Sequence, residues 1–198
     1  MNIDDIRQII RKNNGIVSSK EISANNIDSW YLTDMVRKGE LERVARGIYL
    51  DPKYDNYDEL YLFQLQFSVC IFSHQTALYL HGLTDRYPFF YEVTVYQGYN
   101  SWRFKDKVTS YQVKKPRYKI GITRVKTEMD NLVYTYDMER TICDLVRDRK
   151  NQDPEIFSKA WHYYLNNDDK DIWKLREYAE LFNISKQVEE ILEVIKYE

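Results

Sequence analysis

Three side chains near the middle of the chain belong to types that bind zinc. Cys70, His74 and His81 follow one another at intervals of four and seven positions, which one continuous helix would bring onto a single face. Ser73 is a typical first residue of a helix, so it would interrupt that helix between the cysteine and the histidines. No CxxC or HExxH motif accompanies them. We therefore predict no metal site, and we expect His81 to bond a backbone group near Gly82.

The carboxylates do not form a complete hydrolytic site either. Metal-dependent nucleases hold a cation between two acids beside a lysine, often in an ExK pattern, and no ExK occurs in this sequence. The segment 112–114, QVK, approaches this pattern, with Asp106 upstream but no second acid close by. Between Glu139 and Asp148, opposite charges lie three or four residues apart, which is typical of ion pairs along a helix. We predict that the chain is not an enzyme, with no catalytic residue and no cofactor.

Cations give the strongest functional signal, because they are unevenly distributed along a chain whose net charge is only -2. Residues 100–126 contain nine basic side chains and one acidic side chain. Such a block is typical of a protein that binds a polyanion, although lysines that keep a sheet edge from pairing are an alternative explanation. Aromatic residues that could stack on bases lie among the cations. The basic residues are Arg103, Lys105, Lys107, Lys114, Lys115, Arg117, Lys119, Arg124 and Lys126, and the aromatic ones are Trp102, Phe104, Tyr111 and Tyr118.

A second group of cations lies around a glycine-containing turn near the N-terminus. The stretch GELERVARGIY, residues 39–49, directly follows Arg37-Lys38. Its alternating pattern predicts a β-hairpin with strands at 40–44 and 47–50, joined by a turn at residues 45–47. Arg46 would lie at the tip of this hairpin and Arg43 on its flank.

Three short helices are predicted before the hairpin. The first has isoleucines at helical spacing and ends at Asn14-Gly15, and the second begins with a capping box between Ser18 and Glu21. The third begins at Asp28 and ends before Gly39, which tolerates the left-handed conformation of a helix end. The predicted ranges are 2–13, 18–24 and 28–38.

The third helix has two different faces. At 100° per residue, Tyr31, Leu32, Met35 and Val36 share one arc and are expected to be buried. Hydroxyl, aromatic and cationic side chains share the opposite arc. A short helix, a tight turn and such a second helix, followed by a hairpin, form a winged helix-turn-helix that fits a major groove of double-stranded DNA. The predicted DNA-binding residues are Ser29, Trp30, Thr33, Arg37, Lys38, Arg43 and Arg46, extended by Arg103, Lys105, Lys107, Lys114, Lys115, Arg117 and Lys119 of the basic block.

The rest of the chain predicts a second domain with a small β-sheet and a helical C-terminal part. After a polar segment, we expect a helix over 57–71 and a short helix from Ser73 to Gly82. Four strands and four helices should follow, so the fold class is α+β, with domains at 1–52 and 53–198. The strands are expected at 89–96, 108–113, 120–126 and 132–136, and the helices at 138–149, 154–165, from 171 and from 185.

Three motifs resemble AbiEi-type antitoxins. The arrangement GIVSSKEI...NNIDSWYLTDMVRKGELERVARGIYLD, within residues 15–51, resembles the N-terminal winged helix-turn-helix of that family. SHQTALYLHGLTD at 73–85 and YDMERTICDLVRDR at 136–149 resemble two signatures of its C-terminal domain, in the same order. The resemblance therefore covers nearly the whole chain.

The resemblance implies an antitoxin of a type IV toxin-antitoxin system, which acts in abortive infection and phage resistance. Such a protein is expected to bind inverted repeats in its own promoter and to repress its operon. It would be a monomer or weak dimer that pairs on DNA. Its C-terminal domain is expected to counteract a nucleotidyltransferase toxin without forming a stable complex with it.

The expected location is the cytoplasm. No apolar run reaches the roughly 18 residues of a membrane span, and the N-terminal MNIDDIRQII is charged and amphipathic. Two other functions remain open. A plain winged-helix regulator with a ligand-sensing second domain would lack a neighbouring toxin gene. A nuclease would cut DNA when magnesium is present.

Overall fold

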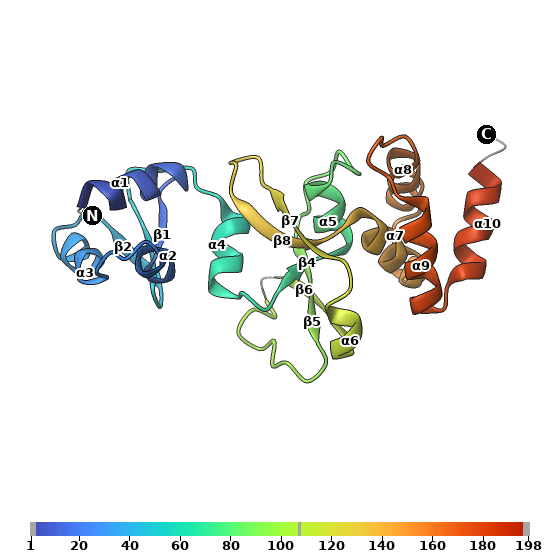
Figure 1. Cartoon of the computed structure of the whole chain (residues 1–198), viewed down its shortest axis with the longest axis horizontal. Helices are drawn as coiled ribbons and strands as arrows, with labels where there is room; N and C mark the ends of the chain where they lie inside the picture. Colours follow the sequence, from blue (N-terminus) through green and yellow to red (C-terminus); the bar gives the residue numbers. More distant parts are fainter. Residues whose placement is uncertain (1–2, 107, 196–198) are drawn as a thin grey trace. The chain divides into compact units, whose positions relative to one another are not determined.

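The computed structural model describes residues 3–106 and 108–195. The chain forms two compact units (Figure 1), and each contains both helices and strands. The N-terminal unit comprises the chain up to Val69 together with Lys126–Val133. The C-terminal unit comprises Cys70–Val125 and the chain from Tyr134 onward. The predicted α+β class is confirmed, whereas a domain boundary at residue 52 stays a prediction.

The N-terminal unit begins with three helices and a three-stranded sheet. The predicted helices and hairpin are confirmed, and β1 is an additional strand that pairs with β3. The sheet is antiparallel in the order β1-β3-β2. The helices are α1 (Ile3–Lys12), α2 (Ser19–Ala24) and α3 (Trp30–Arg37), and the strands are β1 (Ile16–Ser18), β2 (Glu42–Ala45) and β3 (Ile48–Leu50).

Apolar residues at helical spacing form the core of this unit. Ile6 of α1, Ile22 of α2 and Leu32 of α3 are fully buried and pack in one cluster. The Ser18 hydroxyl accepts a hydrogen bond from the Glu21 amide at 3.2 Å, which confirms the serine half of the predicted capping box. The carboxylate of Glu21 accepts two bonds from the Asn13 amide nitrogen, at 2.9 and 3.0 Å, so it ties α2 to the end of α1.

Helix α4, Glu59–Gln66, follows the polar segment after the hairpin. It is shorter than the predicted helix over 57–71, because the helix ends at Gln66 and the chain turns at residues 68–69 before strand β4, Ile71–Phe72. Phe72 pairs with strands on both sides and is completely buried. Apolar runs of this length do not distinguish a buried strand from a helix, which explains the error.

Residues 126–133 join the N-terminal unit through polar contacts with two of its segments. The Asp58 carboxylate accepts hydrogen bonds from Asn131 Nδ2 at 2.9 Å and from Thr127 Oγ1. The side-chain amide of Asn14 donates to the Met129 carbonyl at 2.8 Å. Asp58, Thr127 and Asn131 are all buried. Their hydrogen bonds satisfy polar groups that burial would otherwise destabilise.

The C-terminal unit is built on a five-stranded mixed sheet in the order β6-β5-β4-β8-β7. The four predicted strands are confirmed, two of them with the predicted bounds and two beginning two residues later, and β4 is added at the centre. Strand β5 is parallel to β6, and β4 is antiparallel to β5 and parallel to β8. The strands are β5 (Tyr91–Tyr96), β6 (Val108–Val113), β7 (Ile122–Lys126) and β8 (Leu132–Tyr136), with α5 (His74–Leu80) and α6 (Lys115–Tyr118) between them.

A helical part follows the sheet, as predicted. Aspartates begin three of its helices: the carboxylate of Asp137 accepts from the Arg140 amide at 2.9 Å, and Asp153 and Asp171 act similarly. None of the helices in the described ranges is long and apolar enough to span a membrane. The helices are α7 (Met138–Arg147), α8 (Pro154–Leu165), α9 (Ile172–Phe182) and α10 (Ser185–Ile195), with a 3-10 turn at Arg149–Asn151.

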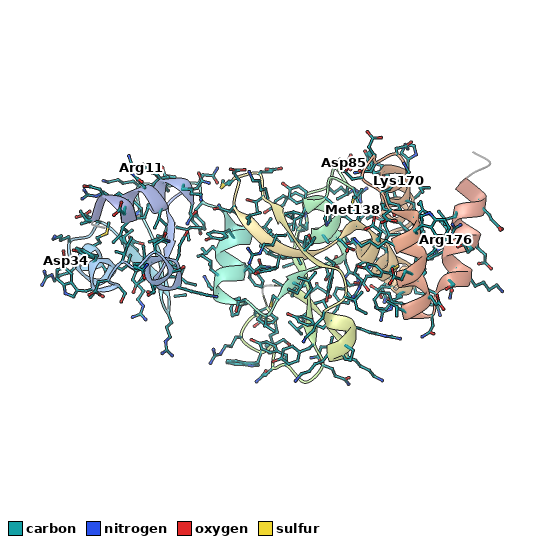
Figure 2. The ribbon with its side chains drawn as sticks, viewed as in Figure 1. Arg11, Asp34, Asp85, Met138, Lys170 and Arg176 are labelled. Atoms are coloured by element: carbon teal, nitrogen blue, oxygen red, sulfur yellow. The ribbon has the colours of Figure 1, made fainter. Side chains whose placement is uncertain are left out.

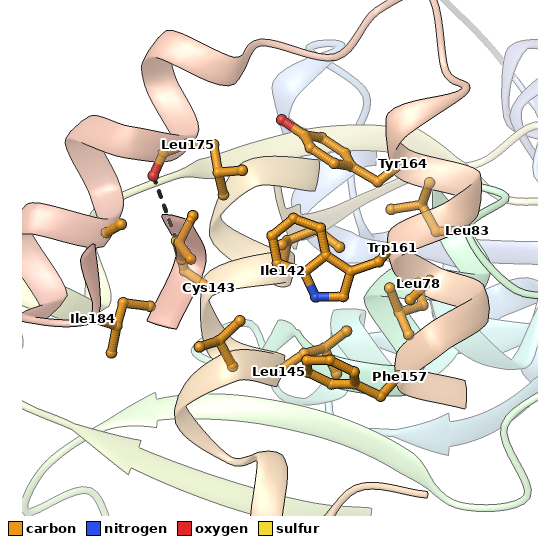
Figure 3. Close-up of a cluster of buried hydrophobic side chains, with 14 of the residues drawn as sticks. Leu78, Leu83, Ile142, Cys143, Leu145, Phe157, Trp161, Tyr164, Leu175 and Ile184 are labelled. Carbon is orange, nitrogen blue, oxygen red and sulfur yellow. Dashed lines mark hydrogen bonds between the residues drawn. The ribbon is translucent and has the colours of Figure 1, made fainter. Parts of the chain in front are cut away.

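The core of this unit lies among the helices (Figure 3). Ile142 and Leu145 of α7 pack with Trp161 of α8 and Leu175 of α9. Cys143 lies in the same cluster, where burial raises the pKa of its thiol to about 12. Both cysteines of the chain are free and buried.

Arg140 is the largest charged group in the interior. Its guanidinium bonds the Asp144 carboxylate at 2.9 Å and donates to the carbonyls of Arg117 and Ile120 at 2.6 and 2.9 Å. It also lies 4.2 Å from the ring centroid of Tyr136. Arg147 pairs with the other oxygen of Asp144 at 2.8 Å. The predicted ion pairs along this helix are confirmed, and their role is structural.

Candidate nucleic-acid interface

The outer face of α3 carries the predicted polar side chains. Ser29, Thr33 and Arg37 are exposed, and Trp30 has 58% of its surface exposed. On the opposite face, Leu32 and Met35 are buried in the core, and Tyr31 and Val36, also predicted to be buried, are partly buried against it. The structure therefore brings the four predicted groups together on one accessible helix face.

Both ends of α3 follow from local sequence. At its start, the Asp28 carboxylate accepts a hydrogen bond from the Trp30 amide at 2.8 Å. At its end, Gly39 adopts φ +73°, a conformation that is strained for other residues. The amides of Gly39 and Glu40 bond the carbonyls of Val36 and Met35 at 3.0 and 2.9 Å. These caps fix the length of the exposed face.

One carboxylate on α3 was not part of the predicted interface (Figure 2). Asp34 is only 7% exposed, and its two oxygens bond different cations. Oδ1 accepts from Arg37 Nη2 at 2.7 Å, and Oδ2 pairs with Lys38 Nζ at 2.6 Å. The hydrogen bond from Lys38 is the main cause that lowers the pKa of the Asp34 carboxyl, and Arg37 adds to it. The i, i+3 and i, i+4 spacing of these residues is the signal that could have revealed the cluster.

The hairpin formed by β2 and β3 supplies the wing. Ala45 pairs with Ile48, so Ala45 belongs to β2 and the turn consists of Arg46 and Gly47, shorter than the predicted turn over 45–47. Gly47 has φ +72°. The register of the pair shifts between Arg43 and Ala45, and such an irregularity bends a strand. Arg43 and Arg46 are both exposed, as the predicted interface requires.

The basic block lies in the C-terminal unit, apart from Lys126. Five of its predicted DNA-binding cations are exposed: Arg103, Lys105, Lys114, Lys115 and Lys119. Lys107 lies outside the described residues. Arg117 is half-buried: its guanidinium donates to the Leu181 carbonyl at 3.4 Å and lies 5.7 Å from the Phe182 ring centroid. Its side chain therefore packs within its own unit more than the sequence indicated.

The aromatic residues of the block divide into two groups. Trp102 is 70% exposed, so its ring could stack on a base. Phe104 is 1% exposed and belongs to the interior, so its predicted stacking role is wrong. The Tyr111 hydroxyl donates to the buried Glu92 carboxylate at 2.8 Å. Only part of the predicted stacking surface is therefore accessible.

The residues that suggested zinc have other partners. His81 Nε2 lies 2.6 Å from the Tyr136 carbonyl, so it bonds a distant strand rather than the turn near Gly82. The His74 ring stacks on Tyr111 with centroids 3.6 Å apart. Burial raises the pKa of the Cys70 thiol to about 12. Within residues 3–106 and 108–195, no three His, Cys, Asp or Glu side chains are placed to hold a metal ion.

A comparison with protein families finds a match in the N-terminal unit. Residues 4–50 match a family described as "Transcriptional regulator, AbiEi antitoxin". A comparison with curated proteins finds no match. The matched residues contain α1 from its second residue, α2, α3 and the whole wing, with the exposed cations of α3 and of the wing. The resemblance to AbiEi antitoxins, which are transcriptional regulators, is thereby confirmed over residues 4–50.

Proposed function

We propose that the protein is the antitoxin and autorepressor of a type IV toxin-antitoxin system. In this proposal the winged helix binds inverted repeats in the promoter of its own operon. The C-terminal unit counteracts a nucleotidyltransferase toxin encoded beside it, which gives phage resistance through abortive infection. The observation that carries the DNA-binding part is the exposed face of α3 with the cationic wing beside it in sequence.

The chemistry of this face suits a duplex. Arg37 and Lys38 lie at the end of α3, and Arg43 and Arg46 lie on the wing, so exposed cations occur on both elements. Cations of this kind neutralise phosphates and set affinity, whereas hydroxyl and aromatic groups such as Thr33 and Trp30 can contact base edges. Inverted repeats require two copies of the protein, each on one half-site.

The first experiment measures binding to the DNA upstream of the gene, with a scrambled duplex for comparison, over a series of salt concentrations. Replacing Arg37 and Arg46 together by alanine removes two cations, so the slope of log K against log salt should become less steep by about 1.8. Arg11 and Lys12, both exposed on α1, provide a control with the same change of charge. Equal losses in the two double variants would contradict the proposed interface.

The second experiment separates repression from neutralisation. Full-length protein with Arg37→Ala and Arg46→Ala should lose repression of a promoter reporter. The same protein should still protect cells that express the neighbouring gene product, because the changed residues belong to the N-terminal unit. If the neighbouring product is harmless alone, the antitoxin proposal is wrong, even if DNA binding is retained.

One observation favours the alternative of a ligand-sensing regulator. A cavity of about 530 Å³ in the C-terminal unit is lined by residues of α8 and α10, including Trp161 and Ile191. Trp161 Nε1 and Gln152 Oε1, on two residues that line it, are buried and have no hydrogen-bond partner within the described part of the chain. Unsatisfied polar groups of this kind often mark a bound water or small molecule. A small molecule that changes promoter affinity, without a toxin gene nearby, would support this alternative.

A further inference from the structure

A buried carboxylate connects the two cations at the end of the DNA-facing helix. We propose that Asp34 is a positioning residue that holds Arg37 and Lys38 and so increases discrimination between the operator and other DNA. This inference rests on the proposed DNA-binding function. The distances that carry it are 2.7 Å from Asp34 Oδ1 to Arg37 Nη2 and 2.6 Å from Oδ2 to Lys38 Nζ.

The helix dipole does not explain an aspartate at this position. Asp34 lies in the second half of α3, toward the C-terminal end, where the helix dipole disfavours negative charge. Asp4 offers a comparison, because it pairs with Arg7 at the same i, i+3 spacing, at 3.5 Å, in the first turn of α1. There the dipole favours the carboxylate. The pair in α1 therefore gains from the dipole and from its spacing, whereas the cluster in α3 gains from its i, i+3 and i, i+4 spacing against the dipole.

The first consequence of the cluster concerns charge. Arg37 and Lys38 together carry two positive charges, and Asp34 cancels one of them. Attraction to phosphates that is independent of sequence depends on the number of cations that displace counterions. Asp34 therefore lowers the effective number of cations that contact phosphates by about one, which weakens binding to DNA of any sequence.

The second consequence concerns geometry. The side chains of Arg37 and Lys38 are 77% and 53% exposed, so without a partner their long chains would sample many rotamers. Each end group is instead held within hydrogen-bonding distance of one buried carboxylate. A group that is already ordered loses less conformational entropy when it contacts a matching site. This ordering should therefore increase the affinity for the operator, but not for an unrelated duplex whose phosphates and bases are placed differently.

The experiment compares wild-type protein with Asp34→Asn on the upstream duplex and on a scrambled duplex. Asparagine keeps the shape but removes the charge, so binding to the scrambled duplex should strengthen and its salt slope should steepen by about 0.9. When the salt concentration rises from 50 to 200 mM, the affinity of Asp34→Asn for the scrambled duplex should therefore decrease about 3.5-fold more than that of the wild type. The ratio of specific to non-specific affinity should fall. Asp4→Asn, with the same change of charge on α1, should leave this ratio unchanged.

A second comparison tests whether Asp34 acts through its partners. In protein with Arg37→Met and Lys38→Met, adding Asp34→Asn should no longer change the specificity ratio, because the cations it positions are gone. A purely structural role would instead lower thermal stability and affect both duplexes equally. Wild-type preference for the upstream duplex, combined with an unchanged ratio in Asp34→Asn, would overturn this inference alone. Failure of the wild type to prefer its upstream duplex would overturn the proposed function as well.

Discussion

Replacing Asp58 by alanine should strongly destabilise the N-terminal unit. The Asp58 carboxylate is 4% exposed and accepts hydrogen bonds from three donors: the Tyr61 amide at 2.9 Å, Asn131 Nδ2 at 2.9 Å and Thr127 Oγ1. Loss of the helix cap alone should cost about 1 kcal/mol. Each of the two buried side-chain donors left without an acceptor should add about 1–2 kcal/mol.

The expected total is a decrease of about 3–5 kcal/mol in the free energy of unfolding of this unit. Hydrogen exchange followed by mass spectrometry measures this locally, in peptides that cover α4 and residues 126–133. Both segments should lose protection together, because one carboxylate holds them.

Asp153→Ala is the matched control. Asp153 also caps a helix, but it is exposed, so its removal leaves no buried donor unsatisfied and α8 should lose little protection. If Asp58→Ala exposes only the first turn of α4 and leaves residues 126–133 protected, the two segments are not coupled through Asp58. The explanation of why these residues belong to the N-terminal unit would then be wrong.

Two further predictions concern the C-terminal unit. Gly121→Ala should lower the thermal stability of this unit by more than Gly98→Ala does. Both glycines have positive φ. An added Cβ at residue 121 would lie 2.7 Å from Arg140 Cβ, whereas no atom lies within 4 Å of an added Cβ at residue 98. Equal effects in differential scanning calorimetry would show that the close approach is unimportant. Burial lowers the pKa of His74 and His81 below the usual 6.5, so the unfolded chain binds protons that the folded unit excludes. Stability should therefore be fully present above pH 6.5 and decrease as the pH falls below it, and urea unfolding from pH 8 to 5 checks this trend in wild type against a variant with both histidines replaced by glutamine.

Local signals made most of the fold predictable. Ser18, Asp137 and Asp153 each cap a helix, and such starts are predictable because the preference of these residues for helix starts acts over only three residues. The exposed face of α3 was likewise predictable, since helical spacing alone separates Thr33 from Leu32.

The errors arise where distant residues decide the structure. Strand β4 consists of two residues, Ile71 and Phe72, and is a strand only because β5 and β8 lie beside it. The preceding apolar run gives no such information. His81 similarly bonds a carbonyl 55 positions away. Pairings of this kind depend on the folded sheet and not on the neighbouring sequence.

The candidate site was predicted residue by residue but not as a network. Exposure of Arg37 and Arg46 follows from periodicity and turn chemistry. The proposed role of Asp34 does not follow from the sequence. An acidic residue on a DNA-facing helix is expected to weaken DNA binding until its two cationic partners are located. Phe104 shows the opposite failure: it lies among lysines in the sequence, yet its ring is buried.

Residues 126–133 have a practical consequence for anyone who wishes to isolate the DNA-binding part. A fragment that ends at Val69 would contain every helix and strand of the matched family segment. It would nevertheless lack two of the three donors to Asp58, those of Thr127 and Asn131, and the carbonyl that receives the Asn14 amide. The N-terminal unit is thus built from two separate stretches of the sequence. Truncation after residue 69, or exchange of residues 1–69 between relatives, would leave Asp58 and Asn14 without these hydrogen-bond partners.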